Sequence, residues 1–95
     1  MWLTIYDERI RACVPSGCMN TFRERSLKLS SCGIQTFPGL LRYGDVPELF
    51  SLIAPRPMQL QCGAQDPLIT PGDRDSMIET VRQAYRAREA DDQLD

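Results

Sequence analysis

Residues 45–62 read DVPELFSLIAPRPMQLQC and carry the clearest structural signals of the chain. Asp45, followed three residues later by Glu48, forms a capping box, in which the two side chains satisfy backbone N–H groups at a helix start. Apolar residues then recur at helical spacing, at Val46, Leu49, Phe50 and Ile53. Pro55 ends this helix because proline cannot continue it. Residues 58–62 alternate apolar and polar side chains, which predicts a strand.

The C-terminal part of the chain predicts an amphipathic helix from about Thr70 to Ala90. Thr70 provides a cap, and Pro71 is suited to the first helical position. The apolar stripe consists of Met77, Ile78, Val81, Ala84 and Tyr85. A stripe with this spacing indicates a helix that covers an apolar surface.

The N-terminal part predicts a short helix over residues 2–6 and a buried strand over Ile10–Val14, which Pro15 and Gly17 stop. Residues 18–43 show no sustained periodicity and are interpreted as a long connection, with one helical turn around residues 22–29.

The order helix, strand, helix, strand, helix is typical of α/β proteins, in which helices cover both faces of a parallel sheet. Two strands are too few for such a sheet. The expected architecture is therefore one incomplete α/β domain over residues 1–95, with the C-terminal part of a parallel sheet and its flanking helices. We expect the other strands to come from elsewhere.

Composition excludes several classes of function. The 95 residues contain no histidine, which removes the usual general base and imidazole metal ligation. A net charge of −2 with scattered basic residues argues against nucleic-acid binding. No apolar run is long enough to cross a membrane. We therefore expect a cytoplasmic protein that has no cofactor and no nucleic-acid or membrane partner.

Four cysteines are present, at Cys13, Cys18, Cys32 and Cys62, without a C-x-x-C pair. Their irregular spacing makes a zinc site held by all four a weak alternative. We expect reduced thiols and core packing for Cys13, Cys18 and Cys62. Metal ligands are not predicted.

Five segments of the chain resemble a known family. They are DERIRACV at 7–14, PGLL at 38–41, DVPEL at 45–49, LIAPRP at 52–57 and CGAQDP at 62–67. Together they resemble the C-terminal half of α/β-hydrolase fold serine hydrolases. The closest branch includes acetyl xylan esterases and dienelactone hydrolase-like proteins.

The resemblance implies that Asp66 is the acid of a Ser-Asp-His triad. Pro67 independently biases Asp66 away from helix and holds it in a loop. Without the resemblance, an Asp-Pro turn residue is the ordinary interpretation of Asp66. In a triad the acid orients the histidine and stabilises its imidazolium form.

Two parts of that machinery are missing from the sequence. The chain has no Gly-x-Ser-x-Gly pentapeptide and no histidine. Nucleophile and base are expected beyond opposite ends of the chain, so it is interpreted as a C-terminal fragment of a carboxylic-ester hydrolase, inactive alone. The complete enzyme would act on acetyl or similar small esters. Ser16 lacks the elbow pattern and is interpreted as a loop serine.

A second hypothesis is a non-catalytic remnant or interaction module. It would self-associate through exposed strands and the apolar helix face. Four arginines could bind an acidic group of a substrate, namely Arg23, Arg25, Arg42 and Arg56. A solvated or salt-bridged role is more usual for such arginines. The sequence therefore assigns them no site.

Overall fold

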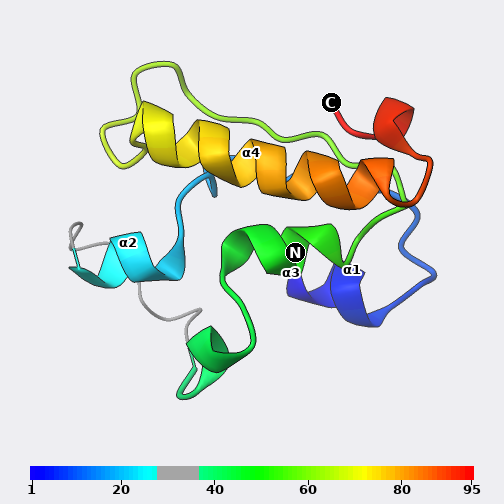
Figure 1. Cartoon of the computed structure of the whole chain (residues 1–95), viewed down its shortest axis with the longest axis horizontal. Helices are drawn as coiled ribbons and strands as arrows, with labels where there is room; N and C mark the ends of the chain where they lie inside the picture. Colours follow the sequence, from blue (N-terminus) through cyan, green and yellow to red (C-terminus); the bar gives the residue numbers. More distant parts are fainter. Residues whose placement is uncertain (28–36) are drawn as a thin grey trace.

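A computed structural model of the chain describes residues 1–27 and 37–95, and for residues 26 and 27 only the backbone (Figure 1). Its elements in chain order are the helices α1 (Trp2–Tyr6), α2 (Phe22–Leu27), α3 (Val46–Ser51) and α4 (Pro71–Arg86), with the short 3₁₀ turns η2 (Leu40–Arg42) and η3 (Asp91–Gln93). The long helix α4 packs against α3.

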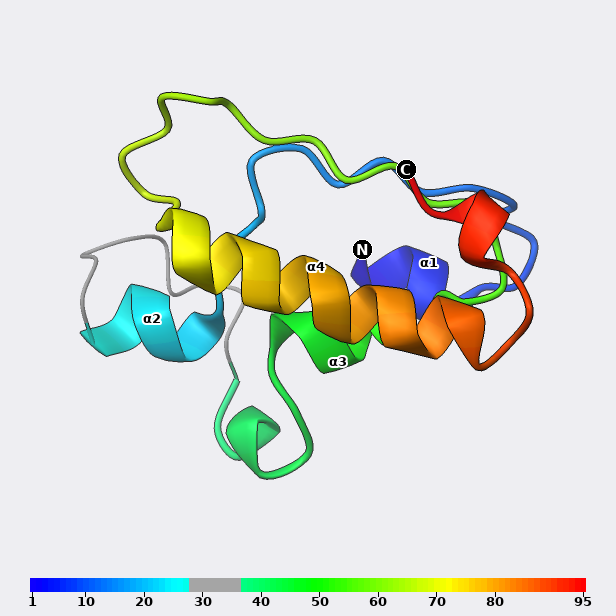
Figure 2. The ribbon, with the colours of Figure 1, turned by 45° about the horizontal axis from the view of Figure 1, so that its top comes forward.

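The predicted α/β fold with a parallel sheet is wrong. In place of a sheet, the described residues contain three isolated parallel bridges, Cys13 to Met58, Ser16 to Gln61 and Met58 to Leu94. The two predicted strands, Ile10–Val14 and 58–62, are extended segments that do not form a continuous ladder. The described residues therefore form helices and extended segments without a sheet, and the extended segments lie along one side (Figure 2).

Proline chemistry explains why the bridges stay isolated. Segment 57–61 lies between segments 13–17 and 93–95, and its backbone is hydrogen-bonded to both. On one side, Cys13 N–H donates to the Pro57 carbonyl and Gly17 N–H donates to the Gln61 carbonyl, at 3.0 and 2.9 Å. Between these two bonds stands Pro15, which has no N–H to give. The ladder is interrupted at the residue that would have joined the two bridges.

The core fills the space between the extended segments and the two central helices. Cys13, Met58 and Leu94 contribute from the extended segments, each at most 8% exposed. The contributions of α3 and α4 are Phe50, Met77, Val81 and Tyr85, all nearly or fully buried. The apolar stripe predicted for the C-terminal helix is thus confirmed at three positions, and the chain itself covers it.

The predicted helix signals are present in the structure, with two differences in the last helix. Asp45 and Glu48 form the predicted capping box at the start of α3. The last helix begins at Pro71, as predicted, but it ends at Arg86 instead of Ala90. Its N-cap, Thr70, makes no side-chain cap hydrogen bond, and its hydroxyl donates to the Glu24 carboxylate at 2.8 Å.

Tyr85 connects the core to the backbone at the start of the central extended segment. Its ring is fully buried, and its hydroxyl donates to the Arg56 carbonyl at 2.6 Å. Burial raises the pKa of Tyr85 to about 12 from an ordinary value of 10.0; Cys13 acts in the same direction and Arg56 opposes it. Above pH 10 the unfolded chain would lose the phenol proton while the folded chain keeps it. Stability contributed by this phenol is therefore complete below pH 10 and is lost as the pH rises through 12.

We predict that Tyr85→Phe lowers the free energy of unfolding by about 1 kcal/mol at pH 7, because a buried hydrogen bond is lost. The variant should also lose less stability than the wild type between pH 10 and 12. Urea unfolding at both ends of this pH range measures each effect. Tyr43→Phe is the matched control, since the Tyr43 side chain is 90% exposed. Equal alkaline losses in the wild type and Tyr85→Phe would contradict the prediction.

Candidate functional site

Asp66 lies in the loop that joins the central extended segment to α4. The loop folds back on itself: Asp66 N–H donates to the Gly63 carbonyl at 3.2 Å, and Leu68 N–H donates to Asp66 Oδ1 at 2.9 Å. Within the part of the chain that the structure describes, the other carboxylate oxygen, Oδ2, accepts no hydrogen bond. The side chain is half-buried. One oxygen is therefore oriented by the backbone, and the other is available to a further donor.

A buried polar cluster fixes this loop to α2. Asn20 Nδ2 donates to the Leu68 carbonyl at 3.0 Å, and the Asn20 carbonyl accepts from Arg25 Nε at 2.5 Å. Glu24, on the same helix, accepts from the Thr70 hydroxyl. Asn20, Glu24 and Arg25 are all at most 8% exposed. Because buried polar groups with several partners hold one geometry, the cluster restricts where the Asp66 loop can lie.

The cluster also has one incomplete member. Glu24 Oε2 is buried and has no hydrogen-bond partner among the described residues. Such an atom normally costs free energy, and the Thr70 bond to Oε1 compensates only half of the carboxylate.

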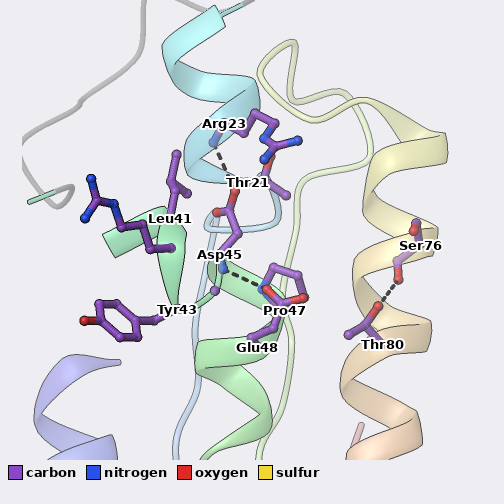
Figure 3. Close-up of a pocket in the computed structure, with 11 residues that line it drawn as sticks. Thr21, Arg23, Leu41, Tyr43, Asp45, Pro47, Glu48, Ser76 and Thr80 are labelled. Carbon is purple, nitrogen blue, oxygen red and sulfur yellow. Dashed lines mark hydrogen bonds between the residues drawn. The ribbon is translucent and has the colours of Figure 1, made fainter. Parts of the chain in front are cut away.

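A polar hollow of about 590 Å³ lies between the starts of α2 and α3 and one side of α4 (Figure 3). At its centre is Asp45, which caps two helices at once. Asp45 Oδ1 accepts from the backbone N–H groups of Phe22 and Val46, at 2.6 and 2.7 Å, and Oδ2 accepts from Arg23 N–H at 3.1 Å. Glu48 in turn accepts from the Asp45 N–H at 2.8 Å. Both carboxylates are used to hold helix starts, so this hollow is a structural junction.

The four arginines that could bind an acidic group have different environments in the structure. Arg56 donates to the carbonyls of Ile10 and Asp7, at 3.0 and 3.2 Å, and so fixes the turn after α1. Arg23 and Arg42 are exposed. Arg25 is 8% exposed and lies 5.3 Å from the centre of the Phe22 ring. The expectation of a solvated or salt-bridged role is therefore wrong for Arg25, and no sequence pattern marks its burial.

Ser16 and the cysteines do not form one site. Ser16 and Cys18 line a second, smaller pocket beside α1. Cys13 is buried and accepts a long hydrogen bond from the Thr4 hydroxyl at 3.6 Å, whereas Cys62 is exposed, so the expectation of core packing is wrong for Cys62. The fourth cysteine, Cys32, lies outside the described residues. Over residues 1–27 and 37–95 no cluster of three or more His, Cys, Asp or Glu side chains is placed to hold a metal ion.

Comparison of the chain with models of known protein families, with curated proteins and with solved structures found no match. In the described part of the chain, none of the helices has the length and apolar character needed to span a membrane.

Proposed function

We propose that this chain supplies the acid of a Ser-Asp-His triad in a carboxylic-ester hydrolase, with Asp66 as that acid. The observation that carries the proposal is the state of the Asp66 carboxylate, whose Oδ1 is held by Leu68 N–H while Oδ2 accepts nothing within the described residues. A triad acid needs this arrangement, since it must be oriented by the protein and still accept the N–H of the histidine. The five segments that resemble acetyl xylan esterases and dienelactone hydrolase-like proteins support the same assignment.

The chemistry then follows from the roles of the triad. A serine hydroxyl attacks the ester carbonyl, the histidine takes its proton, and Asp66 stabilises the imidazolium that forms. The alcohol leaves with that proton, and water releases the acyl group as a carboxylate. Because the 95 residues contain neither a histidine nor a Gly-x-Ser-x-Gly motif, nucleophile and base must be supplied by residues outside them. The proposed substrates are acetyl and similar small esters.

A chimera tests this proposal. Residues 1–95 would replace the corresponding segment of an acetyl esterase from the branch that the chain resembles, leaving that enzyme's serine and histidine in place. The chimera should hydrolyse p-nitrophenyl acetate, whereas the 95-residue chain alone should not. A chimera that unfolds cooperatively but shows no activity above its Ser→Ala control would overturn the proposal.

A second function, self-association, is favoured by the exposed outer edge of segment 13–17. Val14 is 56% exposed, and the N–H groups of Val14 and Ser16 make no backbone hydrogen bond within the described part of the chain. Leu3 and Tyr6 of α1 are also largely exposed. Unpaired strand-like edges of this kind pair with other chains. The stripe on α4 does not contribute, since it is buried.

We predict that the wild-type chain forms dimers at high concentration and that Val14→Lys weakens this association at least tenfold, because a charged edge residue opposes pairing. Sedimentation velocity over a concentration series measures it. Leu52→Lys, which changes an exposed residue at the end of α3, is the control. A wild-type chain that remains monomeric throughout the series would contradict the prediction.

A further inference from the structure

The smaller pocket beside α1 has a chemical character that neither proposed function uses. It has a volume of about 310 Å³ and lies where the start of α1 meets segment 14–18. Its apolar lining comes from Met1, Trp2, Val14, Pro15 and Val46. The polar residues that line it are Ser16, Cys18 and Arg25. A mostly apolar pocket with a few converging polar groups is the usual form of a small-molecule site.

Arg25 is the decisive member of this pocket. The residue is 8% exposed, and its Nε donates to Asn20 Oδ1. Among the described residues, no carboxylate forms an ion pair with Arg25, and its terminal nitrogens make no hydrogen bond. A guanidinium withdrawn from water without a counter-charge is costly, and a bound anion removes that cost. Planar carboxylates match the two parallel N–H donors of arginine.

We propose that this pocket binds a small carboxylate with an apolar tail, such as a short-chain fatty acid. The carboxylate would pair with the free nitrogens of Arg25, and the tail would contact Trp2 and Val14. Phosphate or sulfate fits less well, because either anion would leave the apolar walls in contact with water.

The same arginine connects the pocket to the Asp66 loop. Arg25 donates to Asn20, Asn20 donates to the Leu68 carbonyl, and Leu68 N–H donates to Asp66. A ligand that orders Arg25 would therefore also order the loop. Binding itself requires no ester hydrolysis, so the inference does not depend on the proposed triad.

Trp2 makes the test direct, because it is the single tryptophan of the chain and lines the pocket. The 95-residue chain would be titrated with hexanoate while tryptophan fluorescence is followed, and 1-hexanol serves as an uncharged ligand of similar shape. We expect a saturable change with hexanoate and at least tenfold weaker binding of hexanol, the loss typical of one charge-assisted hydrogen bond.

Two variants separate the pocket from the rest of the surface. Arg25→Gln should weaken hexanoate binding about tenfold or more, whereas Arg23→Gln, which changes an exposed arginine of the same helix, should not. If Arg25→Gln fails to fold, Val14→Phe fills the pocket from an exposed position and should also weaken binding. Equal affinities for hexanoate and hexanol, no saturable change, or a signal that follows dimer formation in sedimentation would each overturn the proposal.

Discussion

Asp66→Asn is expected to lower kcat for p-nitrophenyl acetate by about 10⁴-fold in the chimera that carries residues 1–95, the loss typical of a triad acid. The amide keeps the acceptor that Leu68 N–H uses at Oδ1, so the loop should remain in place. What changes is the group that faces the histidine. An amide lacks the negative charge that stabilises the imidazolium, and its NH2 group can donate a hydrogen bond that favours the wrong tautomer of the histidine. KM should change far less than kcat, since Asp66 does not contact the substrate in this mechanism.

The pH profile separates a triad acid from a structural residue. Loss of the acid removes the stabilisation of the imidazolium, so the residual activity of Asp66→Asn should rise at alkaline pH, where the histidine is neutral. Asp92→Asn is the matched control, because Asp92 is exposed and, among the described residues, its carboxylate accepts a hydrogen bond only from the neighbouring Gln93 side-chain amide. Full activity in Asp66→Asn would show that the Asp-Pro sequence is an ordinary turn.

Signals confined to one segment of sequence predicted the helices well. The capping box at Asp45 and the proline after Thr70 each place a helix start, because both act on backbone groups within the first turn. The buried stripe of α4 follows from spacing along a single helix. In each case the local spacing of residues is enough to predict the helix start or the apolar face of the helix.

The extended segments were predicted less well because a strand depends on its neighbours. Residues 58–62 have the alternation of a strand, yet the ladder beside them is broken by the missing N–H of Pro15, more than forty residues earlier. The sequence shows Pro15, but it does not show which carbonyl that residue faces. An apolar pattern predicts an extended backbone, and only the pairing determines whether a sheet forms.

The two candidate sites also differ in how far their features depend on residues distant in the sequence. The sequence singles out Asp66 as a candidate triad acid, and the structure gives the orientation of its carboxylate. The sequence assigns no site to Arg25. Its hydrogen-bond partner Asn20 is bonded to Leu68, and the adjacent Glu24 is bonded to Thr70, through contacts between residues far apart in the chain. Those pairs are separated by 48 and 46 residues. An arginine in a short helix carries no local mark of such an environment.

Asp45→Ala is expected to lower the free energy of unfolding by about 2 to 3 kcal/mol. A typical N-cap loss costs about 1 kcal/mol, and here one carboxylate caps both α2 and α3. At α2 the substitution leaves the N–H groups of Phe22 and Arg23 without their acceptor. Phe22 is fully buried, so water cannot readily replace the lost bond to its N–H. Urea unfolding measures the change, with Asp92→Ala as the exposed control.

The same substitution ties the stability of α2 to the pocket. The short helix α2 carries Arg25, and its six residues are too few to be stable without tertiary contacts and a cap. Asp45→Ala should therefore weaken hexanoate binding even though Asp45 lies outside the pocket, and Asp92→Ala should not. If Asp45→Ala destabilised the chain no more than its control does, the double cap would contribute little, and the position of Arg25 would have to be fixed by Asn20 and the Phe22 ring alone.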